Sequence, residues 1–403
     1  MTKKSDAPAI RFKGFSDAWE QRKLGELVDR VVRKNINNES TLPLTISAQY
    51  GLVDQITYFN NRVASRDVSN YYLVLNGEFA YNKSTSDGYP FGAVKRLDLY
   101  EKGVLSTLYI VFAPKKEQQI DSDYLTVFFD TDRWHKGVAE RAAEGARNHG
   151  LLNISAEDFF DIDLSVPKDI VEQKQIGAFI RQLDNLITLH QRKFEKLTNV
   201  KKSMLEKMFP QNGSSYPEIR FKGFTDPWEQ RKFEEIAVRS SVICSDDTLP
   251  RVEYEDIVSG TGRLNKDIYA KQSSKSGIVF HQGDVLYGKL RPYLQNWLLP
   301  TFDGLAVGDF WVLQPQNADS SFLYRLIQSR QFDEVANQST GTKMPRADWK
   351  LVSKTVFSIP SNISEQAAIG TYFTALDSLI TLHQRELEKL QNIKKSMLEK
   401  MFV

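Results

Sequence analysis

Two long stretches of this chain carry the spacing of apolar residues that is typical of amphipathic helices. In the first stretch, apolar side chains recur in three- and four-residue steps at Ile176, Phe179, Leu183, Leu186, Phe194, Leu197, Met204 and Met208. The second stretch repeats this spacing at Ile369, Tyr372, Leu376, Leu379, Leu387, Leu390, Met397 and Met401. A helix of about 34 residues would be roughly 51 Å long, so we expect the two helices to pack together as a coiled coil.

Both helices are preceded by the same type of start signal. Pro167 comes before Asp169 and Glu172, and the same order of residue types returns at 360–365. A polar residue followed three positions later by glutamate is typical of a capping box at a helix N-terminus. We therefore interpret Glu172 as the third helical residue of such a box.

The stretches between these helices have the shorter pattern of strands and turns. Runs rich in β-forming residues lie at Val104–Phe112 and Leu305–Leu313, and the Gly-containing dipeptides at 76–77 and 87–88 indicate turns. Short helices are expected at 121–134 and 320–336, and residues 210–219 are typical of a surface linker. The fold class expected is α+β.

The chain repeats itself once. Residues 11–27 recur at 220–236 with 12 of 17 positions identical, and we call these two stretches the leading segments. Residues 176–209 recur at 369–402 with 24 of 34 positions identical. The intervening blocks barely resemble each other, so the chain alternates variable blocks with constant helices. Neutral drift would have eroded the helices as well, which favours a functional reason for the contrast.

Net charge, cysteine content and hydropathy say little about which class of protein this is. The net charge is +2, so a DNA-binding surface would have to be a local basic patch on a nearly neutral body. The single cysteine, Cys244, cannot form an internal disulfide, and no secretory signal is evident at the N-terminus. These features predict a cytoplasmic protein, and no apolar run is long enough to predict a membrane span.

Motifs for catalysis are missing from the sequence. There is no phosphate-binding GxxxxGK[ST] loop, no doubled-proline tetrad of adenine methyltransferases, no dinucleotide fingerprint and no cysteine set for zinc. The residues Asp161, Asp163, Glu172 and Lys174 could form a nuclease-like metal cluster, but the second copy lacks the lysine. We predict no catalytic residue, no metal ligand and no cofactor in this chain.

The order of these elements resembles the specificity subunit of type I restriction–modification enzymes. The resemblance covers nearly the whole chain and is carried by the helices at 172–197 and 365–390, by GEFAYNKSTSDGYPFG at 77–92 and by GDVLYGKLRPYL at 283–294. It implies two duplicated α/β target recognition domains separated by two long antiparallel helices, with pseudo-twofold symmetry. The implied boundaries are 1–167 for the first domain, 168–209 for the central helix, 210–219 for the linker, 220–360 for the second domain and 361–403 for the C-terminal helix.

The resemblance also implies the partners. Each recognition domain would read one half of a split double-stranded DNA target, and the helices would set the unread spacer. Two methyltransferase subunits would bind the chain, and translocase–nuclease subunits would complete the restriction enzyme. S-adenosylmethionine, ATP and Mg²⁺ would then be held by the partner subunits and not by this chain.

Candidate DNA contacts follow from the need for cations at phosphates and for donors and acceptors in a groove. In the first domain, Lys83, Ser84, Ser86 and Tyr89 lie in a polar, turn-rich stretch directly after an apolar run, and Arg147, Asn148 and His149 lie between two glycines. Arg96 is a further candidate outside these two stretches. In the second domain the candidates comprise Lys289, Arg291, Tyr293, Lys343 and Arg346. Any of them could instead be an ordinary solvated residue, and Tyr81 and Tyr287 fit a core position as well as a contact.

Two other functions stay open from the sequence alone. The chain could be an enzyme, which incubation of the pure protein with DNA and S-adenosylmethionine would reveal. It could also be a scaffold without a DNA role, in which case duplex DNA would not shift on a gel when the methyltransferase subunit is present. The bases read and the spacer length do not follow from the sequence.

Overall fold

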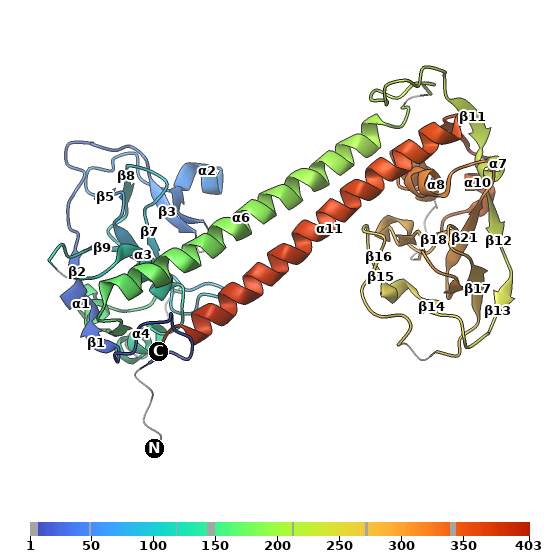
Figure 1. Cartoon of the computed structure of the whole chain (residues 1–403). Coiled ribbons are helices and arrows are strands. Elements are labelled where there is room, and N and C mark those ends of the chain that lie inside the picture. Colours follow the sequence, from blue (N-terminus) through green and yellow to red (C-terminus); the bar gives the residue numbers. More distant parts are fainter. Residues whose placement is uncertain are drawn as a thin grey trace. The chain divides into compact units, whose positions relative to one another are not determined.

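The computed structural model describes residues 7–47, 50–117, 119–142, 150–211, 213–270, 273–338 and 344–403. It forms two compact units: unit 1 combines Met1–His190 with Glu386–Val403, and unit 2 is Gln191–Arg385. Each unit contains one mixed domain together with a part of both long helices (Figure 1). We call the residues of unit 1 that precede the first long helix domain 1, and residues 220–360 domain 2.

The long helices are α6 (Ile170–Lys207) and α11 (Ile363–Lys400), each of 38 residues. The predicted start signals are confirmed at both. A carboxylate oxygen of Asp169 accepts a hydrogen bond from the Val171 amide at 2.8 Å, and the Asn362 side chain accepts one from Ser364 at the same distance. Such bonds satisfy backbone donors that the first turn of a helix leaves without partners.

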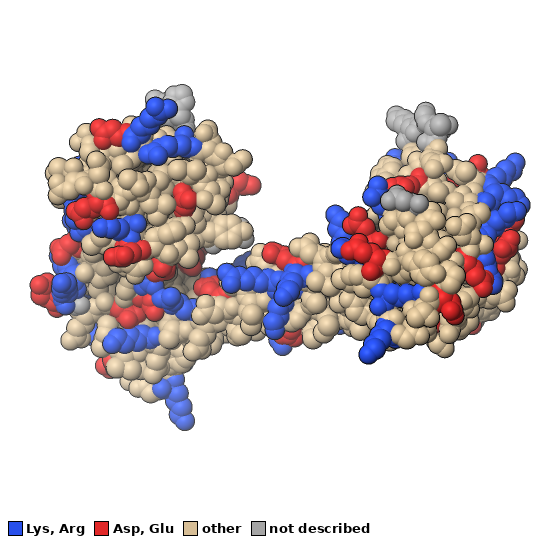
Figure 2. Space-filling view, turned by 90° about the horizontal axis from the view of Figure 1, so that it is seen from above, with Lys and Arg blue, Asp and Glu red and all other residues tan. Residues whose placement is uncertain are grey.

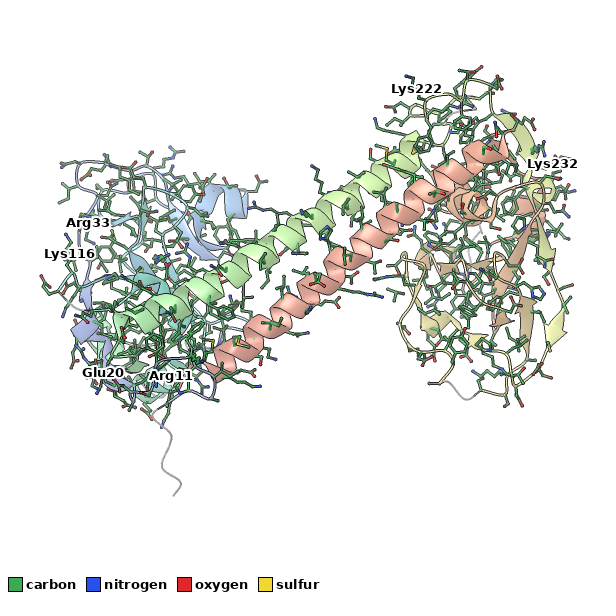
Figure 3. The ribbon with its side chains drawn as sticks, viewed as in Figure 1. Arg11, Glu20, Arg33, Lys116, Lys222 and Lys232 are labelled. Carbon is green, nitrogen blue, oxygen red and sulfur yellow. The ribbon has the colours of Figure 1, made fainter. Side chains whose placement is uncertain are left out.

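The interpretation of Glu172 as a capping-box residue is wrong. Its carboxylate is 0% exposed and accepts two hydrogen bonds from the Arg11 guanidinium, at 2.6 and 2.8 Å (Arg11 is labelled in Figure 3). Glu365 forms the same bidentate pair with Arg220 at 2.7 and 2.8 Å. A buried carboxylate requires a cation, and each leading segment supplies one to the first turn of the helix that follows its own domain.

The two domains begin and end with the same order of elements and differ between these ends. Domain 1 contains β1 (Glu20–Lys23), α1 (Leu24–Leu27), β2 (Val28–Arg30), β3 (Leu44–Ser47), β4 (Gly51–Asp54), α2 (Gln55–Phe59), β5 (Tyr72–Leu75), β6 (Phe79–Asn82), β7 (Ala93–Arg96), β8 (Lys102–Leu105), β9 (Ile110–Pro114), α3 (Ser122–Phe129), α4 (His135–Arg141), α5 (Ala156–Phe160) and β10 (Asp163–Val166). Domain 2 contains β11 (Glu229–Lys232), α7 (Phe233–Ile236), β12 (Ala237–Ser240), β13 (Ile243–Cys244), β14 (Arg251–Val252), η1 (Tyr254–Asp256), β15 (Ile257–Val258), β16 (Arg263–Leu264), β17 (Gly277–Phe280), β18 (Val285–Gly288), η2 (Pro292–Leu294), β19 (Trp297–Leu298), β20 (Gly304–Ala306), β21 (Phe310–Pro315), α8 (Ser320–Leu326), α9 (Arg330–Ala336), α10 (Trp349–Lys354) and β22 (Val356–Ile359).

The sheets confirm that the domains are two copies of one fold. A four-stranded antiparallel sheet has the order β2-β9-β6-β7 in domain 1 and β12-β21-β18-β19 in domain 2. The first and last strands of each domain also pair, β1 with β10 and β11 with β22, in the same antiparallel arrangement. The smaller sheets differ: β5 pairs with β8 in domain 1, whereas domain 2 has the order β13-β17-β20-β14.

The structure divides some of the predicted elements. The β-rich run at Val104–Phe112 comprises the end of β8 and the start of β9, because residues 106–109 form a turn between them. The helix expected at 320–336 is α8 followed by α9, since the Ser329 side chain accepts a hydrogen bond from the Phe332 amide and begins a new helix. Apolar periodicity alone does not reveal such interruptions, which depend on local side-chain capping.

Each unit is held together by an aromatic side chain that follows the end of a long helix. In unit 1, Phe402 lies edge-on to Trp19, with ring centroids 6.1 Å apart, and stacks on Tyr124 at 5.6 Å. In unit 2, Phe209 takes the same place against Trp228 and Phe322, at 6.0 and 5.7 Å. These residues are buried, so the tryptophans of the leading segments are core residues that join each domain to a helix.

Within each unit the two helices run antiparallel, and a charge pair joins them. The start of α6 packs against the end of α11 in unit 1, where Lys394 binds Asp184 at 2.7 Å. In unit 2, Lys201 binds Asp377 at 2.6 Å. Lys201 and Lys394 occupy equivalent positions of the repeat, as do Asp184 and Asp377. None of the helices in the described residues has the length and apolar character that crossing a membrane demands.

We predict that the Arg11→Met substitution lowers the melting temperature of unit 1. It leaves the buried Glu172 carboxylate without its cation, and removing one partner of a buried ion pair typically costs about 3 kcal/mol or more. Thermal unfolding of the full chain measures the effect. The double substitution Arg11→Met with Glu172→Met should recover most of the loss, and an unchanged melting temperature in the single variant would contradict this role of the pair.

Candidate nucleic-acid interface

The loop after strand β18 has an unusual backbone in domain 2. Arg291 and Gln295, which flank the short helix η2, have φ angles of +49° and +55°. Residues other than glycine rarely adopt this left-handed conformation, which costs free energy and is concentrated at functional sites. The surrounding contacts must therefore hold this loop in place.

Two backbone hydrogen bonds join this loop to a segment about 55 residues later. The Arg291 amide donates to the Pro345 carbonyl at 2.7 Å, and the Ala347 amide donates to the Lys289 carbonyl at 2.8 Å. Between them Leu290 forms a β-bridge with Arg346. The structure thus brings together the two stretches of domain 2 in which the sequence placed candidate DNA contacts.

We call the loop after β18 and the segment at Pro345–Ala347 that binds it the loop pair of domain 2. An aspartate neutralises and orients the cations of this loop pair. Asp309 lies 3.0 Å from the Arg346 guanidinium and 3.5 Å from the Lys289 ammonium. Partial burial would raise the pKa of Asp309, but Arg346 and Lys289 outweigh that effect and hold the pKa below its ordinary value. Asp309 is therefore ionised at neutral pH and orients the two cations at the surface.

A half-buried tyrosine holds the same loop through its hydroxyl group. The Tyr254 hydroxyl donates to the Asp309 carbonyl oxygen at 2.6 Å and accepts a hydrogen bond from the Leu290 amide at 2.9 Å. Burial raises the pKa of Tyr254, so it stays protonated and able to donate. The outward side carries exposed side chains of several kinds: Tyr293 is 56% exposed and Met344 is 47% exposed. Cations, a phenol and apolar groups together suit contacts to phosphates and base edges.

Domain 1 has the same arrangement with different side chains. After strand β6, the Lys83 carbonyl accepts a hydrogen bond from the Leu152 amide at 3.0 Å, as that of Lys289 does from Ala347. Ser84 forms a β-bridge with Leu151, and the Thr85 amide donates to the Gly150 carbonyl at 2.6 Å. The loop after the central strand and a distant later segment therefore meet in both domains.

The outer part of the loop in domain 1 is a tight turn. Ser86 and Tyr89 exchange backbone hydrogen bonds at 2.9 and 3.3 Å, and Gly88 has a φ of +77°, which confirms the turn predicted at Asp87-Gly88. Gly92 is required where it stands, because a Cβ atom there would lie 2.1 Å from the Asn82 carbonyl oxygen. Ser84, Ser86 and Tyr89 are exposed on this turn.

The structure places the other candidates as follows. In domain 1, Lys83 is half-buried and donates to the Ile154 carbonyl at 3.3 Å. In domain 2, Arg346 is exposed. Arg96 is 8% exposed, and its guanidinium is bound to Asp98, Ser122 and Asp123, so burial removes it from the candidate interface. Tyr81 and Tyr287 are core residues. The remaining candidates, Arg147, Asn148, His149 and Lys343, lie outside the described residues.

Sequence reasoning missed the residues that hold these loops in position. Asp309, Tyr254, Thr85 and Gly150 act through contacts over 20 to 65 residues, and no local pattern signals such contacts. The one usable signal was glycine: Gly150 and Gly308, with φ of +73° and +101°, mark the turns from which Leu151 and Asp309 reach the loops.

The nuclease-like fragment does not form a cluster. Asp161 is bound by Arg141 and Lys23, Asp163 is bound by Lys23, and Glu172 is buried beneath Arg11. In the part of the chain that the structure describes, no group of three His, Cys, Asp or Glu residues could hold a metal ion. Figure 2 shows basic and acidic side chains interspersed on the visible face of each unit.

Comparison with known proteins identifies the family of this arrangement. The family model of the type I restriction modification DNA specificity domain matches residues 17–199 and again residues 227–392. The chain is 23% identical to the type I restriction enzyme MjaVIII specificity subunit of Methanocaldococcus jannaschii, over 85% of this chain and 82% of that protein. It is 22% identical to the EcoDI specificity subunit of Escherichia coli, over 95% and 88%.

A solved structure supports the fold independently. The crystal structure of a type I restriction-modification system S subunit from M. genitalium has a TM-score of 0.61 and 14% sequence identity, and the likeness covers 98% of this chain and 99% of that one. The family match extends over both domains and most of both long helices. The chain belongs to the family of type I restriction–modification specificity subunits, the DNA-recognising components of these systems.

Proposed function

We propose that the chain reads a bipartite DNA target, with one half of the target read by each domain. The observation that carries this proposal is the loop pair described above, which occurs in both domains on the same backbone scaffold but with different side chains. A shared scaffold would present each loop pair to DNA in the same manner, and different side chains would select different bases. The two half-sites are then unrelated in sequence.

Domain 2 offers the chemistry for both parts of such a contact. Lys289 and Arg346 would bind phosphates, and their bonds to Asp309 would be exchanged for bonds to the backbone of DNA. Tyr293 and Met344 are exposed beside them and would contact base edges or thymine methyl groups. In domain 1, the hydroxyls of Ser84 and Ser86 and the phenol of Tyr89 take this role.

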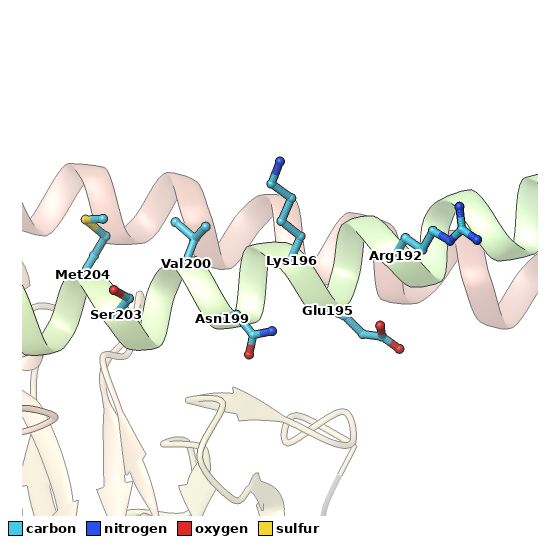
Figure 4. Close-up of a pocket in the computed structure, with 7 residues that line it drawn as sticks. All are labelled: Arg192, Glu195, Lys196, Asn199, Val200, Ser203 and Met204. Carbon is cyan, nitrogen blue, oxygen red and sulfur yellow. The ribbon is translucent and has the colours of Figure 1, made fainter. Parts of the chain in front are cut away.

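The long helices would dock the methyltransferase subunits. A shallow groove of about 510 Å³ on α6 is lined by Arg192, Glu195, Lys196, Asn199, Val200, Ser203 and Met204 (Figure 4). The same residue types recur on α11 at Arg385, Glu388, Lys389, Asn392, Ile393, Ser396 and Met397, with only Val200 replaced by Ile393. A surface that is repeated almost unchanged, beside loops that differ, fits two copies of one partner.

The division of labour follows from this docking. The methyltransferase subunits would hold S-adenosylmethionine and modify an adenine in each half-site, and translocase–nuclease subunits would hold ATP and Mg²⁺ and complete the restriction enzyme. This chain would contribute recognition and no catalytic group. The pure chain, incubated with DNA and S-adenosylmethionine, is expected to transfer no methyl group.

We expect the two loop pairs to act on separate halves of the target. Tyr89→Ala should relax the bases required in one half-site, and Tyr293→Ala should relax those in the other, because loss of one base contact typically removes about 1–3 kcal/mol of discrimination. Mapping N6-methyladenine by long-read sequencing, in cells that express the chain with its methyltransferase subunit, measures the effect. Each variant is the control for the other, and a change in both halves from either substitution would contradict separate reading.

The repeated groove predicts two equivalent docking sites. Lys196→Glu and Lys389→Glu should each reduce the bound methyltransferase from two copies to one, and the double variant should lose both, because each change reverses a charge on one groove. Native mass spectrometry of the co-purified complex measures the ratio. Lys193→Glu is the matched control, since the second copy already carries glutamate at this position, Glu386. Full occupancy in the double variant would exclude these grooves.

The helices should act as the ruler of the spacer. Four residues inserted after Gln191 and four after Gln384 fall between the Asp184–Lys394 and Lys201–Asp377 pairs in both helices, so the register at each end is kept. Each helix lengthens by about 6 Å and turns slightly more than once, which should add one or two base pairs to the unread spacer. The methylation motif, read by long-read sequencing, gives the spacer.

A two-residue insertion at the same places is the control for this experiment. It turns the apolar stripe by roughly half a turn and should prevent assembly. A four-residue variant that assembles and methylates with the original spacer would show that the helices do not set it.

A further inference from the structure

Unit 2 contains a large cavity that the DNA-recognition role does not use. It has a volume of about 890 Å³ and lies between domain 2 and the parts of α6 and α11 that belong to the same unit. Its apolar walls include Phe194, Leu205, Trp297, Leu299 and Ile380. This volume is within the range of pockets that hold small organic ligands, roughly 300–1,000 Å³.

Charged groups at one side of the cavity are not balanced. Asp377 is bound by two cations, the Lys201 ammonium at 2.6 Å and the Arg325 guanidinium at 2.7 Å. Their side chains are 15% and 3% exposed, so solvent screens this cluster only weakly. Five cationic and three anionic residues line the whole cavity, namely Lys201, Lys202, Arg263, Arg325 and Arg330 against Glu206, Asp333 and Asp377.

The equivalent cluster in unit 1 is balanced. There Lys394 binds Asp184 at 2.7 Å and Asp130 at 3.4 Å, and Lys95 binds Asp130 at 2.7 Å. Burial alone would raise the pKa of Asp130, but the two ammonium groups outweigh it and hold the pKa below its ordinary value. Two cations therefore face two carboxylates, and the pocket beside them has only about 350 Å³.

The position of Asp130 in unit 1 is occupied by Gln328 in unit 2. The equivalence rests on the helix caps: Asp121 and Asp319 cap α3 and α8, and their amides donate to Gln173 and Gln366, each at 2.8 Å. Counting nine residues from each cap gives Asp130 and Gln328. Unit 2 thus has two cations at this place, Lys201 and Arg325, and lacks the second carboxylate.

Three donors in the cavity walls also lack acceptors. The indole NH of Trp297, the Nε–H of Arg325 and the side-chain NH₂ of Gln328 are buried, and none of them has a hydrogen-bond partner among the residues that the structure describes. Trp297 and Arg325 are 6% and 2% exposed. Donors buried in this way cost free energy until an acceptor reaches them, so the walls favour a ligand with acceptor oxygens.

We propose that this cavity binds a small organic anion. Its carboxylate or phosphate group supplies the second negative charge that Asp130 supplies in unit 1, and it faces Lys201 and Arg325 beside the Gln328 side chain. An aromatic or apolar body lies against the indole of Trp297 and the aliphatic wall. Because the ligand contacts domain 2, α6 and α11 at once, its binding stabilises unit 2 without a counterpart in unit 1. This inference is independent of the proposed DNA-reading role.

Thermal unfolding of the full chain, followed together with tryptophan fluorescence, tests the site. The probes are indole-3-acetate and adenosine 5′-monophosphate as anions with an aromatic body, inorganic phosphate as the anion alone, and adenosine as the uncharged body. We expect one or both of the first two probes to raise the melting temperature and to change the fluorescence. Adenosine should have no effect and phosphate a much weaker one.

The decisive variant is Gln328→Asp, which gives unit 2 the carboxylate that unit 1 already has. It should raise the melting temperature of the ligand-free chain and weaken probe binding by about tenfold or more, since the new carboxylate competes for the same cations. Gln338→Asp adds the same charge at an exposed position outside the cavity and should change neither quantity. Absence of binding to the unchanged chain, equal binding to Gln328→Asp, or equal binding of phosphate alone would each overturn the proposal.

Discussion

The construction of this chain depends on a carboxylate that is buried at the first turn of each long helix. Glu172 and Glu365 cannot leave water without a cation, and each receives a bidentate guanidinium from a leading segment 161 or 145 residues earlier. The same segments run beside the end of the other helix, where the Ile10 amide donates to Lys400 and the Ile219 amide to Lys207. One ion pair in each unit thereby joins a domain, the start of one helix and the end of the other.

This constraint explains which parts of the two copies agree. The residues of the leading segments and of the helices are tied to one another through Arg11, Glu172, Trp19 and Phe402 and their equivalents, so a change in one must be matched by another. The strands of the central sheets keep their order through backbone hydrogen bonds, which place weaker demands on side chains. The two copies are therefore similar in sequence where side-chain contacts tie the leading segments to the helices. They differ in sequence where backbone hydrogen bonds hold the strands together.

The sequence predicted the helices and the duplicated α+β organisation correctly, since both rest on local periodicity and on the repeat. The capping residues Asp169 and Asn362 were also predicted, because a cap acts within three residues. Pairings over long distances along the chain were not: the Arg11–Glu172 pair and the burial of Arg96 beneath Asp98 and Asp123 depend on folding that no local pattern contains. The sequence also indicated the loops on which the candidate residues lie. It did not indicate Asp309 and Tyr254, which orient the loop pair of domain 2 through contacts far along the chain.

The way the loops are anchored bears on how new specificities arise. In both domains the anchors are backbone amides and carbonyls, at Lys83 and Leu152 and at Lys289 and Ala347, and any residue except proline at a donating position can make such bonds. The side chains between these backbone bonds are therefore not needed to hold the ends of the loop together. The outward residues can therefore be substituted one at a time while the backbone bonds keep the loop closed. Under the DNA-reading role proposed for these loops, a new target could arise through many small steps, none of which unfolds the protein.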